Sequence, residues 1–409
     1  MNLEKMLEKY ADLIVELGLN VQPGDKIRIR LTEEALPLAR LVSKKAYEKG
    51  ALNLHLDFSD DSINLNRYLF GSDEVFDYLP DYEISYRKAH FEDGYHLLAL
   101  ETPNPELLKS ADPKRIARWQ KLAGSKMKPL MHYTMQNEVK WCIAGVACTA
   151  WAKAAFPELP PKEGLEALWK NIFLAERIDQ EDPVQAWQKH DAELKAHKAF
   201  LNKARFSKLH FVGPGTDLLV GLPEDHIWEG GSSVSKKGER FFPNIPTEEV
   251  FTMPHADQVE GHLAATMPLA VRGQIVDKFG FTFKEGKVMD YHAEMGKPIL
   301  DDLLAMDEGA KRLGEVALVA AHSPIANTGI LFKSTLFDEN ASCHFALGAA
   351  YSENLLGANE RSEEENRKLG MNDSLIHVDF MVGSESVTVS GIQEDGSEIV
   401  LLKEGNWQI

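Results

Sequence analysis

Segment 376–380 contains a histidine and an aspartate, His377 and Asp379, set between apolar residues. Side chains alternate between the two faces of a strand, so these two polar groups would share one face and the apolar residues the other. Burying an imidazole beside a carboxylate costs free energy unless a partner satisfies both, and a divalent metal ion would do so. The pair therefore predicts further metal ligands elsewhere in the chain.

Two further segments place glutamates beside apolar runs. Segment 246–252 contains the neighbours Glu248 and Glu249. In a strand these side chains would point to opposite faces, so only one of them could face a site, and the pattern leaves open which one. In segment 314–320, Glu315 stands at the start of an apolar run typical of a buried strand. This run would place a carboxylate at the mouth of the strand.

A fourth segment, 337–344, ends in His344 and continues to Gly348 and Tyr351. If the chain after Asn340 is helical, His344 and Tyr351 are seven residues apart and share one face of the helix. The glycine between them would leave room for an ion or a substrate. The pattern leaves open whether this segment is helical.

Together these segments offer two carboxylates, two histidines and a further aspartate. Such a mixed oxygen and nitrogen set suits Zn²⁺, Co²⁺ or Mn²⁺. Five ligands exceed the three that one catalytic zinc usually takes from a protein. Two ions bridged by one carboxylate would use all of them, and such a pair polarises a carbonyl and generates hydroxide near neutral pH. Taken singly, each residue has a simpler explanation as a solvated glutamate or a hydrogen-bonded core histidine.

Other motifs are weaker. His255 and His262 flank Glu260, but the spacing differs from the His-Glu-x-x-His pattern of zinc proteases. Segment 233–236 matches Ser-x-x-Lys without the companion motifs of a serine enzyme. Segment 212–216 lacks the Gly-Lys-Ser/Thr sequence of a phosphate-binding loop. These segments indicate no second chemistry.

The elements that must position these residues fall into two kinds. The first half alternates helix and strand patterns, which favours an α/β fold with a parallel or mixed sheet covered by helices. The second half has hairpin-linked strands around 285–286 and 394–396, which favours an α+β fold with a curved, mainly antiparallel sheet. We therefore predict an N-terminal domain, 1–210, and a C-terminal metal-binding catalytic domain, 211–409. The expected helices are 3–17, 33–49 and 183–204, and the expected strands are 26–31, 52–58, 96–100, 141–147, 275–283, 288–291, 387–392 and 397–403.

Length and composition agree with this division. A chain of 409 residues is expected to form more than one domain. The net charge of −18 disfavours nucleic acid and anionic membranes as partners. No run of 18 apolar residues and no signal peptide stands in the sequence, and the three cysteines form no Cys-x-x-Cys pair. We expect a cytoplasmic protein.

The four segments together resemble one known family. Residues 244–252, 314–319, 335–344 and 377–384 are similar to the thermophilic metallo-aminopeptidase family, the aminopeptidase T and aminopeptidase S group. The resemblance extends through essentially the whole chain. It implies a cytosolic homodimeric exopeptidase with a two-metal site in the C-terminal domain, supported by zinc or cobalt, with manganese or magnesium also accepted. Its substrates would be peptides with a free N-terminus.

The resemblance also assigns roles to residues. The metal ligands would be Glu249, Glu315, His344, His377 and Asp379. Glu315 would bridge two ions, and a hydroxide between them would attack the first peptide bond. Tyr351 would be an active-site residue that donates to the developing oxyanion. Glu339 is the candidate general base.

Two alternative functions remain open at this point. The first is another dinuclear metallohydrolase acting on amides or phosphoesters, of which the amide is favoured because no arginine or lysine cluster accompanies the ligand segments. The second is a non-catalytic protein that binds a small molecule and holds a structural metal. A structural zinc site is closed and four-coordinate, whereas five ligands and a tyrosine indicate an open site.

Overall fold

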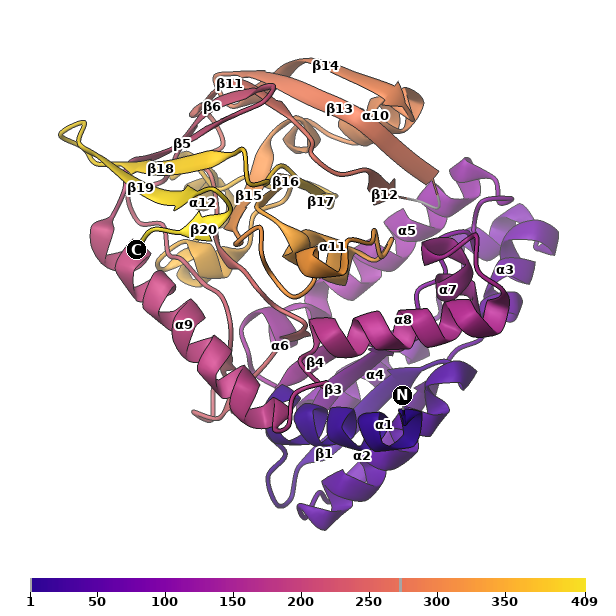
Figure 1. Cartoon of the computed structure of the whole chain (residues 1–409). Coiled ribbons are helices and arrows are strands. Elements are labelled where there is room, and N and C mark those ends of the chain that lie inside the picture. Colours follow the sequence, from indigo (N-terminus) through magenta and orange to yellow (C-terminus); the bar gives the residue numbers. More distant parts are fainter. Residues whose placement is uncertain (1, 272–273) are drawn as a thin grey trace. The chain divides into compact units, whose positions relative to one another are not determined.

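The computed structural model of the protein describes residues 2–271 and 274–409 (Figure 1). The chain forms two compact units. The first unit runs to Gln188 and includes Ser232–Pro246, and the second consists of Lys189–Gly231 and Thr247–Ile409. The chain therefore crosses between the units three times, and the long helix α9 (Pro183–Ala204) makes the first crossing.

A parallel sheet forms the centre of the first unit, with the strand order β2-β1-β3-β4-β9. The strands are β1 (Lys26–Leu31), β2 (Asn53–Phe58), β3 (Tyr95–Glu101), β4 (Trp141–Gly145) and β9 (Asn244–Ile245). The helices are α1 (Leu3–Leu13), α2 (Leu36–Glu48), α3 (Asp61–Phe70), α4 (Asp81–Glu92), α5 (Pro113–Met127), α6 (His132–Met135), α7 (Thr149–Ala155) and α8 (Pro161–Ala175). A short pair, β7 (Ser233–Val234) with β8 (Arg240–Phe241), completes the unit.

The α/β prediction for this half is confirmed, because strands and helices alternate and the sheet is parallel. On β1, the fully buried Ile27 and Ile29 alternate with Arg28 and Arg30, so one face of this strand is apolar and the other carries charged side chains. The predicted helix 33–49 begins instead as a 3-10 turn, and Thr32 does not cap it through its side chain.

The second unit contains a large, antiparallel sheet in the order β12-β13-β11-β6-β5-β18-β19-β20, with β14 beside β13. Both predicted hairpins are present. The turn between β13 and β14 consists of Glu285 and Gly286, and both have positive φ angles, 48° and 73°. Two residues with positive φ form the turn that matches the twist of a hairpin. The strands are β5 (Lys208–Gly213), β6 (Thr216–Gly221), β11 (Val259–Ala264), β12 (Leu269–Val271), β13 (Gln274–Lys284), β14 (Lys287–Met295), β18 (Thr388–Ile392), β19 (Glu398–Lys403) and β20 (Asn406–Trp407).

A smaller antiparallel sheet has the order β10-β15-β16-β17. Its strands are β10 (Val250–Thr252), β15 (Leu313–Leu318), β16 (His344–Gly348) and β17 (His377–Met381). The helices of the second unit are α10 (Lys297–Leu304), α11 (Thr335–Asp338) and α12 (Glu363–Lys368), and α9 continues into it. Together the two antiparallel sheets and these helices confirm the α+β prediction.

The helical alternative for the segment after Asn340 is not found. A 3-10 turn, Glu339–Ala341, ends at Ser342 in extended backbone, and β16 follows. The reason is pairing on both sides, since β16 is hydrogen-bonded to β15 and to β17. Alternation also fits a strand, because the apolar Phe345 and Leu347 join the hydrophobic core while the smaller Ala346 lies between them.

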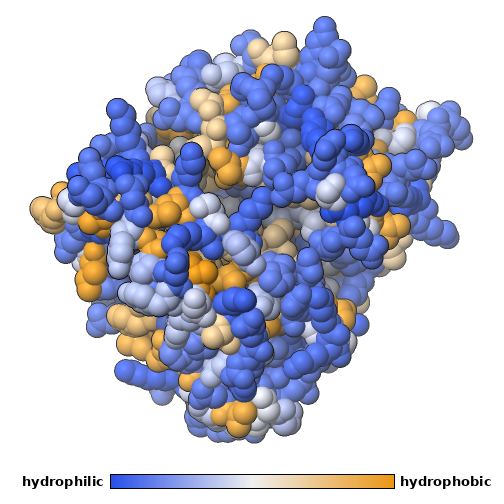
Figure 2. All heavy atoms as spheres, turned by 180° about the vertical axis from the view of Figure 1, so that it is seen from behind, coloured by the Kyte–Doolittle hydropathy of each residue, from blue (hydrophilic) through white to orange (hydrophobic). Residues whose placement is uncertain are grey.

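The surface has the polar character expected from the charge of the chain. The face shown in Figure 2 is mostly hydrophilic, and its apolar residues form separate clusters. Among residues 2–271 and 274–409, no helix combines the length and the apolar character needed to cross a membrane.

Candidate metal centre

The register of the small sheet gathers the polar residues on one face. Ala346 of β16 is paired with Glu315 of β15 on one side and with Asp379 of β17 on the other. His344 is paired with Ala317, and His377 with Gly348. Since paired residues in an antiparallel sheet share a face, two histidines and two carboxylates point to the same side. Three neighbouring strands therefore build a single polar surface.

Small residues lie between these polar groups. Ala317, Ala346 and Gly348 carry one side-chain carbon or none, which leaves space above the sheet. Gly348 has a φ of 108°, and a Cβ atom there would lie 2.0 Å from the carbonyl oxygen of Ile376. Only glycine fits this close approach of β16 to β17. The opposite face of the sheet is apolar, with Val316, Phe345 and Phe380 in the core of the second unit.

The polar residues form two overlapping clusters, each made of three ligand atoms that lie within 4.8 Å of one another. In the first, His344 Nε2 lies 3.1 Å from Glu249 Oε2 and 3.3 Å from Glu315 Oε1. In the second, His377 Nε2 lies 3.6 Å from Glu315 Oε2 and 3.3 Å from Asp379 Oδ1. Glu315 thus turns one oxygen to each histidine. The two clusters share only this carboxylate.

Backbone carbonyls hold both imidazole rings in place. His344 Nδ1 lies 3.2 Å from the carbonyl oxygen of Ser342, and His377 Nδ1 lies 2.7 Å from that of Ala349. With the proton on Nδ1, each ring presents a bare Nε2 to carboxylate oxygens. This arrangement is unfavourable without a cation, and it is the usual arrangement of histidines that bind metals.

The pKa values show the same need for positive charge. Burial alone would lower the pKa of His344, but its contacts with Glu249 and Glu315 raise that pKa well above the usual value. For His377, Asp379 likewise outweighs burial and raises the pKa to about 9. Protons on Nε2 therefore satisfy the carboxylates in the metal-free protein.

Two carboxylate oxygens depend on this positive charge. Glu249 Oε2 and Asp379 Oδ1 are buried, and each lies against a histidine Nε2 that satisfies it only when protonated. Buried charged oxygens are normally paired or bound to metal. Residues Glu249 and Asp379 are 7% and 9% exposed, so solvent contributes little. The donor set thus fits a pair of divalent cations.

Tyr351 and Glu339 lie beside the two clusters. Tyr351 is in the loop after β16, not on a helix face shared with His344, and Glu339 begins the 3-10 turn before β16. The ring of Tyr351 is 4.6 Å from that of His377, centroid to centroid. Burial and the nearby Glu315 raise the pKa of Tyr351 well above its usual value, so the phenol keeps its proton. Desolvation and the charges of Asp379 and Glu249 raise the pKa of Glu339 well above its usual value.

Asn340, which is fully buried, connects two parts of this surface and was not predicted. Its side-chain oxygen accepts the backbone N–H of Glu248 at 2.7 Å, and its Nδ2 lies 3.4 Å from Glu339 Oε1. It therefore positions the segment before β10, which carries Glu249, relative to Glu339. No periodicity distinguishes this asparagine in the sequence, because its partner Glu248 is distant along the chain.

Both glutamates of the pair 248–249 are buried, but only Glu249 belongs to the histidine cluster. The two residues precede β10, so strand alternation does not apply to them. Glu248 Oε2 lies 3.5 Å from His190 Nε2, which also contacts the carbonyl oxygen of Thr247. Glu248 is thus directed to α9, and Glu249 to the histidine cluster.

The fold and this polar surface match a family of metallopeptidases. The model of the thermophilic metalloprotease family M29 matches residues 3–407. The chain therefore belongs to this family, and the resemblance seen in the four segments is confirmed. Membership implies a divalent metal ion.

Relatives and a solved structure agree over the whole chain. Aminopeptidase T of Thermus aquaticus is 44% identical over 403 residues, which covers 98% of each chain. Aminopeptidase AmpS of Bacillus subtilis (strain 168) is 41% identical over 401 residues, again covering 98% of each chain. The structure of wild-type AmpT from Thermus thermophilus has a TM-score of 0.93, 41% identity and 99% coverage of both chains.

Proposed function

We propose that this metallopeptidase is an aminopeptidase that removes N-terminal residues from peptides at a paired metal centre. The observation that carries the proposal is Glu315, whose two oxygens face two different histidine clusters. A carboxylate placed in this way suits a bridge between two ions. The aminopeptidase activity is supported by the names of the relatives, which are similar over nearly their whole length.

The five proposed ligands divide between two positions. Glu249 and His344 would hold one ion, His377 and Asp379 the other, and Glu315 both. When bound, such ions supply Lewis acidity to the substrate carbonyl and lower the pKa of water. Zinc or cobalt suits the imidazole and carboxylate set, and manganese or magnesium is the further choice.

Two side chains of the protein act on protons in this proposal. Glu339 takes the proton of the attacking water, for which a carboxylate with a raised pKa is suited. Tyr351 keeps its proton and donates a hydrogen bond to the oxygen of the scissile carbonyl as negative charge develops there. Both lie at the edge of the polar surface where a substrate would meet the ligands.

Hydrolysis of aminoacyl anilides tests the proposal directly. We expect hydrolysis of leucine p-nitroanilide to be lost after chelation and restored by Zn²⁺ or Co²⁺. The N-acetylated anilide should not be cleaved, because an aminopeptidase binds a free amine. Equal rates on the blocked substrate would contradict an exopeptidase, and activity that survives full chelation would contradict a metal-dependent one. Hydrolysis of a phosphoester but no anilide would favour the other dinuclear hydrolase.

Replacing Tyr351 by phenylalanine is expected to lower kcat by about 10²–10³-fold, the usual cost of losing one oxyanion donor. The KM should change little, because the hydroxyl acts mainly on the transition state. Steady-state kinetics on the anilide measure both constants. Tyr291→Phe is the matched control, since Tyr291 is on β14 and its hydroxyl contacts Asp301. A kcat within threefold of wild type for Tyr351→Phe would exclude the donor role.

Further expectations belong to the same proposal. We propose a homodimer in the cytoplasm, with the catalytic domain in residues 211–409. The exposed apolar residues Ile63 and Phe70 on α3, a helix without buried residues, support a covered surface in the first unit. The three cysteines are free and buried, which suits a reducing compartment.

A further inference from the structure

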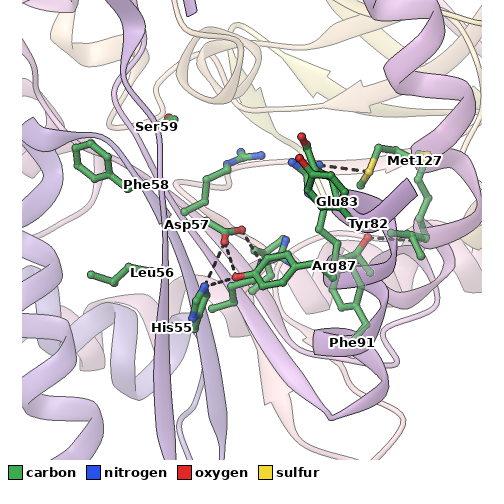
Figure 3. Close-up of a pocket in the computed structure, with 17 residues that line it drawn as sticks. His55, Leu56, Asp57, Phe58, Ser59, Tyr82, Glu83, Arg87, Phe91 and Met127 are labelled. Atoms are coloured by element: carbon green, nitrogen blue, oxygen red, sulfur yellow. Dashed lines mark hydrogen bonds and ion pairs between the residues drawn. The ribbon is translucent and has the colours of Figure 1, made fainter. Parts of the chain in front are cut away.

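The first unit contains a cavity of about 650 Å³ that the peptidase chemistry does not use. Its walls come from β1, β2 and the start of β3, and from α4, the end of α5 and the turn that follows. Figure 3 shows Tyr82, Glu83 and Arg87 of α4 across from the residues of β2. All lining residues belong to the first unit.

Three guanidinium groups line this cavity, and two of them, those of Arg28 and Arg87, are not fully satisfied. The side chain of Arg28 is 9% exposed, and its Nε lies 3.0 Å from Asp57 Oδ2. Its Nη1 is buried without any hydrogen-bond partner. Buried polar groups are nearly always paired, so a buried cationic donor that faces a cavity indicates a missing acceptor. Burial lowers the pKa of Arg28, and the nearby positive charge of Arg87 lowers it further, although Asp57 opposes this.

Arg87 also lacks a carboxylate partner. Its Nη1 lies 3.3 Å from the sulfur of Met127, a weak acceptor (Figure 3). Within the described ranges 2–271 and 274–409, no carboxylate forms an ion pair with this arginine. Glu83 stands one helical turn earlier, at the spacing that favours such a pair, yet does not make it. One cation and one anion on the same wall of the cavity thus remain unpaired.

Most of the other charged groups of the cavity already have partners. Tyr86 contacts His55 and Asp57, and Arg30 Nη2 lies 2.7 Å from Glu101 Oε1. The apolar part of the lining includes Phe91, Leu97, Met127 and Leu130. A ligand would therefore meet free donors at Arg28 and Arg87, a free acceptor at Glu83, and an apolar wall.

We propose that this cavity binds a free amino acid or short peptide with an apolar side chain, whose carboxylate is held by Arg28 and Arg87 and whose ammonium group is held by Glu83. The apolar side chain packs against Phe91, Leu97 and Leu130. Two guanidiniums suit a planar carboxylate because they offer parallel N–H donors.

The charges favour a carboxylate over a phosphate. Asp57 and Glu83 line the same cavity as the arginines, so a phosphate dianion would meet two negative charges. A zwitterion matches both signs, and its apolar part matches the remaining wall. The proposal involves residues of the first unit only, so its test does not depend on the metal centre.

Calorimetry on the chelated full chain tests the proposal, because chelation removes coordination at the metal centre as a source of binding heat. The probes are L-leucine, N-acetyl-L-leucine, L-leucinamide and inorganic phosphate. We expect L-leucine to bind, and Arg87→Met to weaken it about ten- to a hundredfold, as loss of a charge-assisted hydrogen bond does. Leucinamide should bind at least tenfold more weakly than leucine. The matched control is Arg40→Met, which removes an exposed arginine of the same unit outside the cavity.

A second variant keeps the test decisive if Arg87→Met is unstable. Glu83→Gln should weaken L-leucine but leave N-acetyl-L-leucine, which has no ammonium group, within twofold. Hydrogen exchange should slow in 82–91 when leucine is added to the wild type. Equal leucine affinity in the wild type and both variants would overturn the proposal, as would tighter binding of phosphate than of leucine. Arg87→Met should hydrolyse the anilide at the wild-type rate, so a failure of the peptidase assay remains distinguishable.

Discussion

Replacing Glu315 by glutamine is expected to abolish peptide hydrolysis while leaving the fold intact. The two side chains have nearly the same shape, but the amide nitrogen of glutamine is a donor and cannot replace the second ligand oxygen. Loss of an outer partner of a metal ligand typically costs about 10–100-fold in metal affinity or activity. Because Glu315 faces both histidine clusters, its loss should exceed that range.

Two measurements check this expectation together. The kcat on leucine p-nitroanilide gives the loss of activity, and the metal content per chain after dialysis shows whether ions are lost with it. Glu294→Gln is a suitable control, because Glu294 lies exposed on β14 and pairs with Lys278. Activity of Glu315→Gln within tenfold of wild type, at full metal content, would refute the bridging role.

Replacing Lys140 by methionine is expected to destabilise the first unit by about 3–5 kcal/mol, the usual cost of breaking a buried ion pair from one side. Lys140 is fully buried, and its Nζ lies 2.7 Å from Asp25 Oδ2 and 3.0 Å from Glu239 Oε2. His96 Nε2 lies 3.3 Å from the other oxygen of Asp25. Three of these residues have the spacing of metal ligands, but the ammonium group already supplies the cation.

The pH dependence of this loss follows from Asp25. Burial opposes ionisation of Asp25, but His96 and Lys140 outweigh it and hold the pKa well below the usual value. A carboxylate with a depressed pKa in the folded state stabilises the protein above its unfolded pKa of about 3.9, and that contribution disappears as pH falls through the folded pKa. The difference between wild type and Lys140→Met should therefore be largest at neutral pH and decrease below about pH 4.

Urea denaturation followed by tryptophan fluorescence measures the change in the free energy of unfolding. Lys88→Met provides the control, since Lys88 is an exposed residue of α4 in the same unit and should change stability by no more than about 0.5 kcal/mol. Unfolding of Lys140→Met at the same urea concentration as the control would show that this ion cluster contributes nothing to stability.

The sequence predicted the elements whose patterns are local. The helix 183–204 is found as Pro183–Ala204, and the hairpin around Glu285 and Gly286 follows from its turn residues. The sequence did not show whether segment 344–348 is a helix or a strand, because the segment is short. Its pairing with β15 and β17 makes it a strand. Strand pairing is non-local, so no pattern within the segment could reveal it.

The candidate ligands could be singled out because charged residues are conspicuous in apolar strands. His377 and Asp379 were placed on one face by alternation, and the structure agrees. Alternation did not settle the choice between Glu248 and Glu249, which lie before the strand. The roles of Asn340, Arg28 and Arg87 depend on contacts between distant segments, and the spacing of these residues in the sequence carries no signal of them.

The small sheet has a consequence for how this protein can change over evolutionary time. On β15, Glu315 and Ala317 lie on the face of the clusters, whereas Val316 and Leu318 fill the core. An insertion or deletion of one residue within this stretch would turn Glu315 into the core and an aliphatic side chain toward the other ligands. Single substitutions at the core positions can be accommodated. A shift in the register of this strand relative to its neighbours would disrupt both the core and the set of metal ligands.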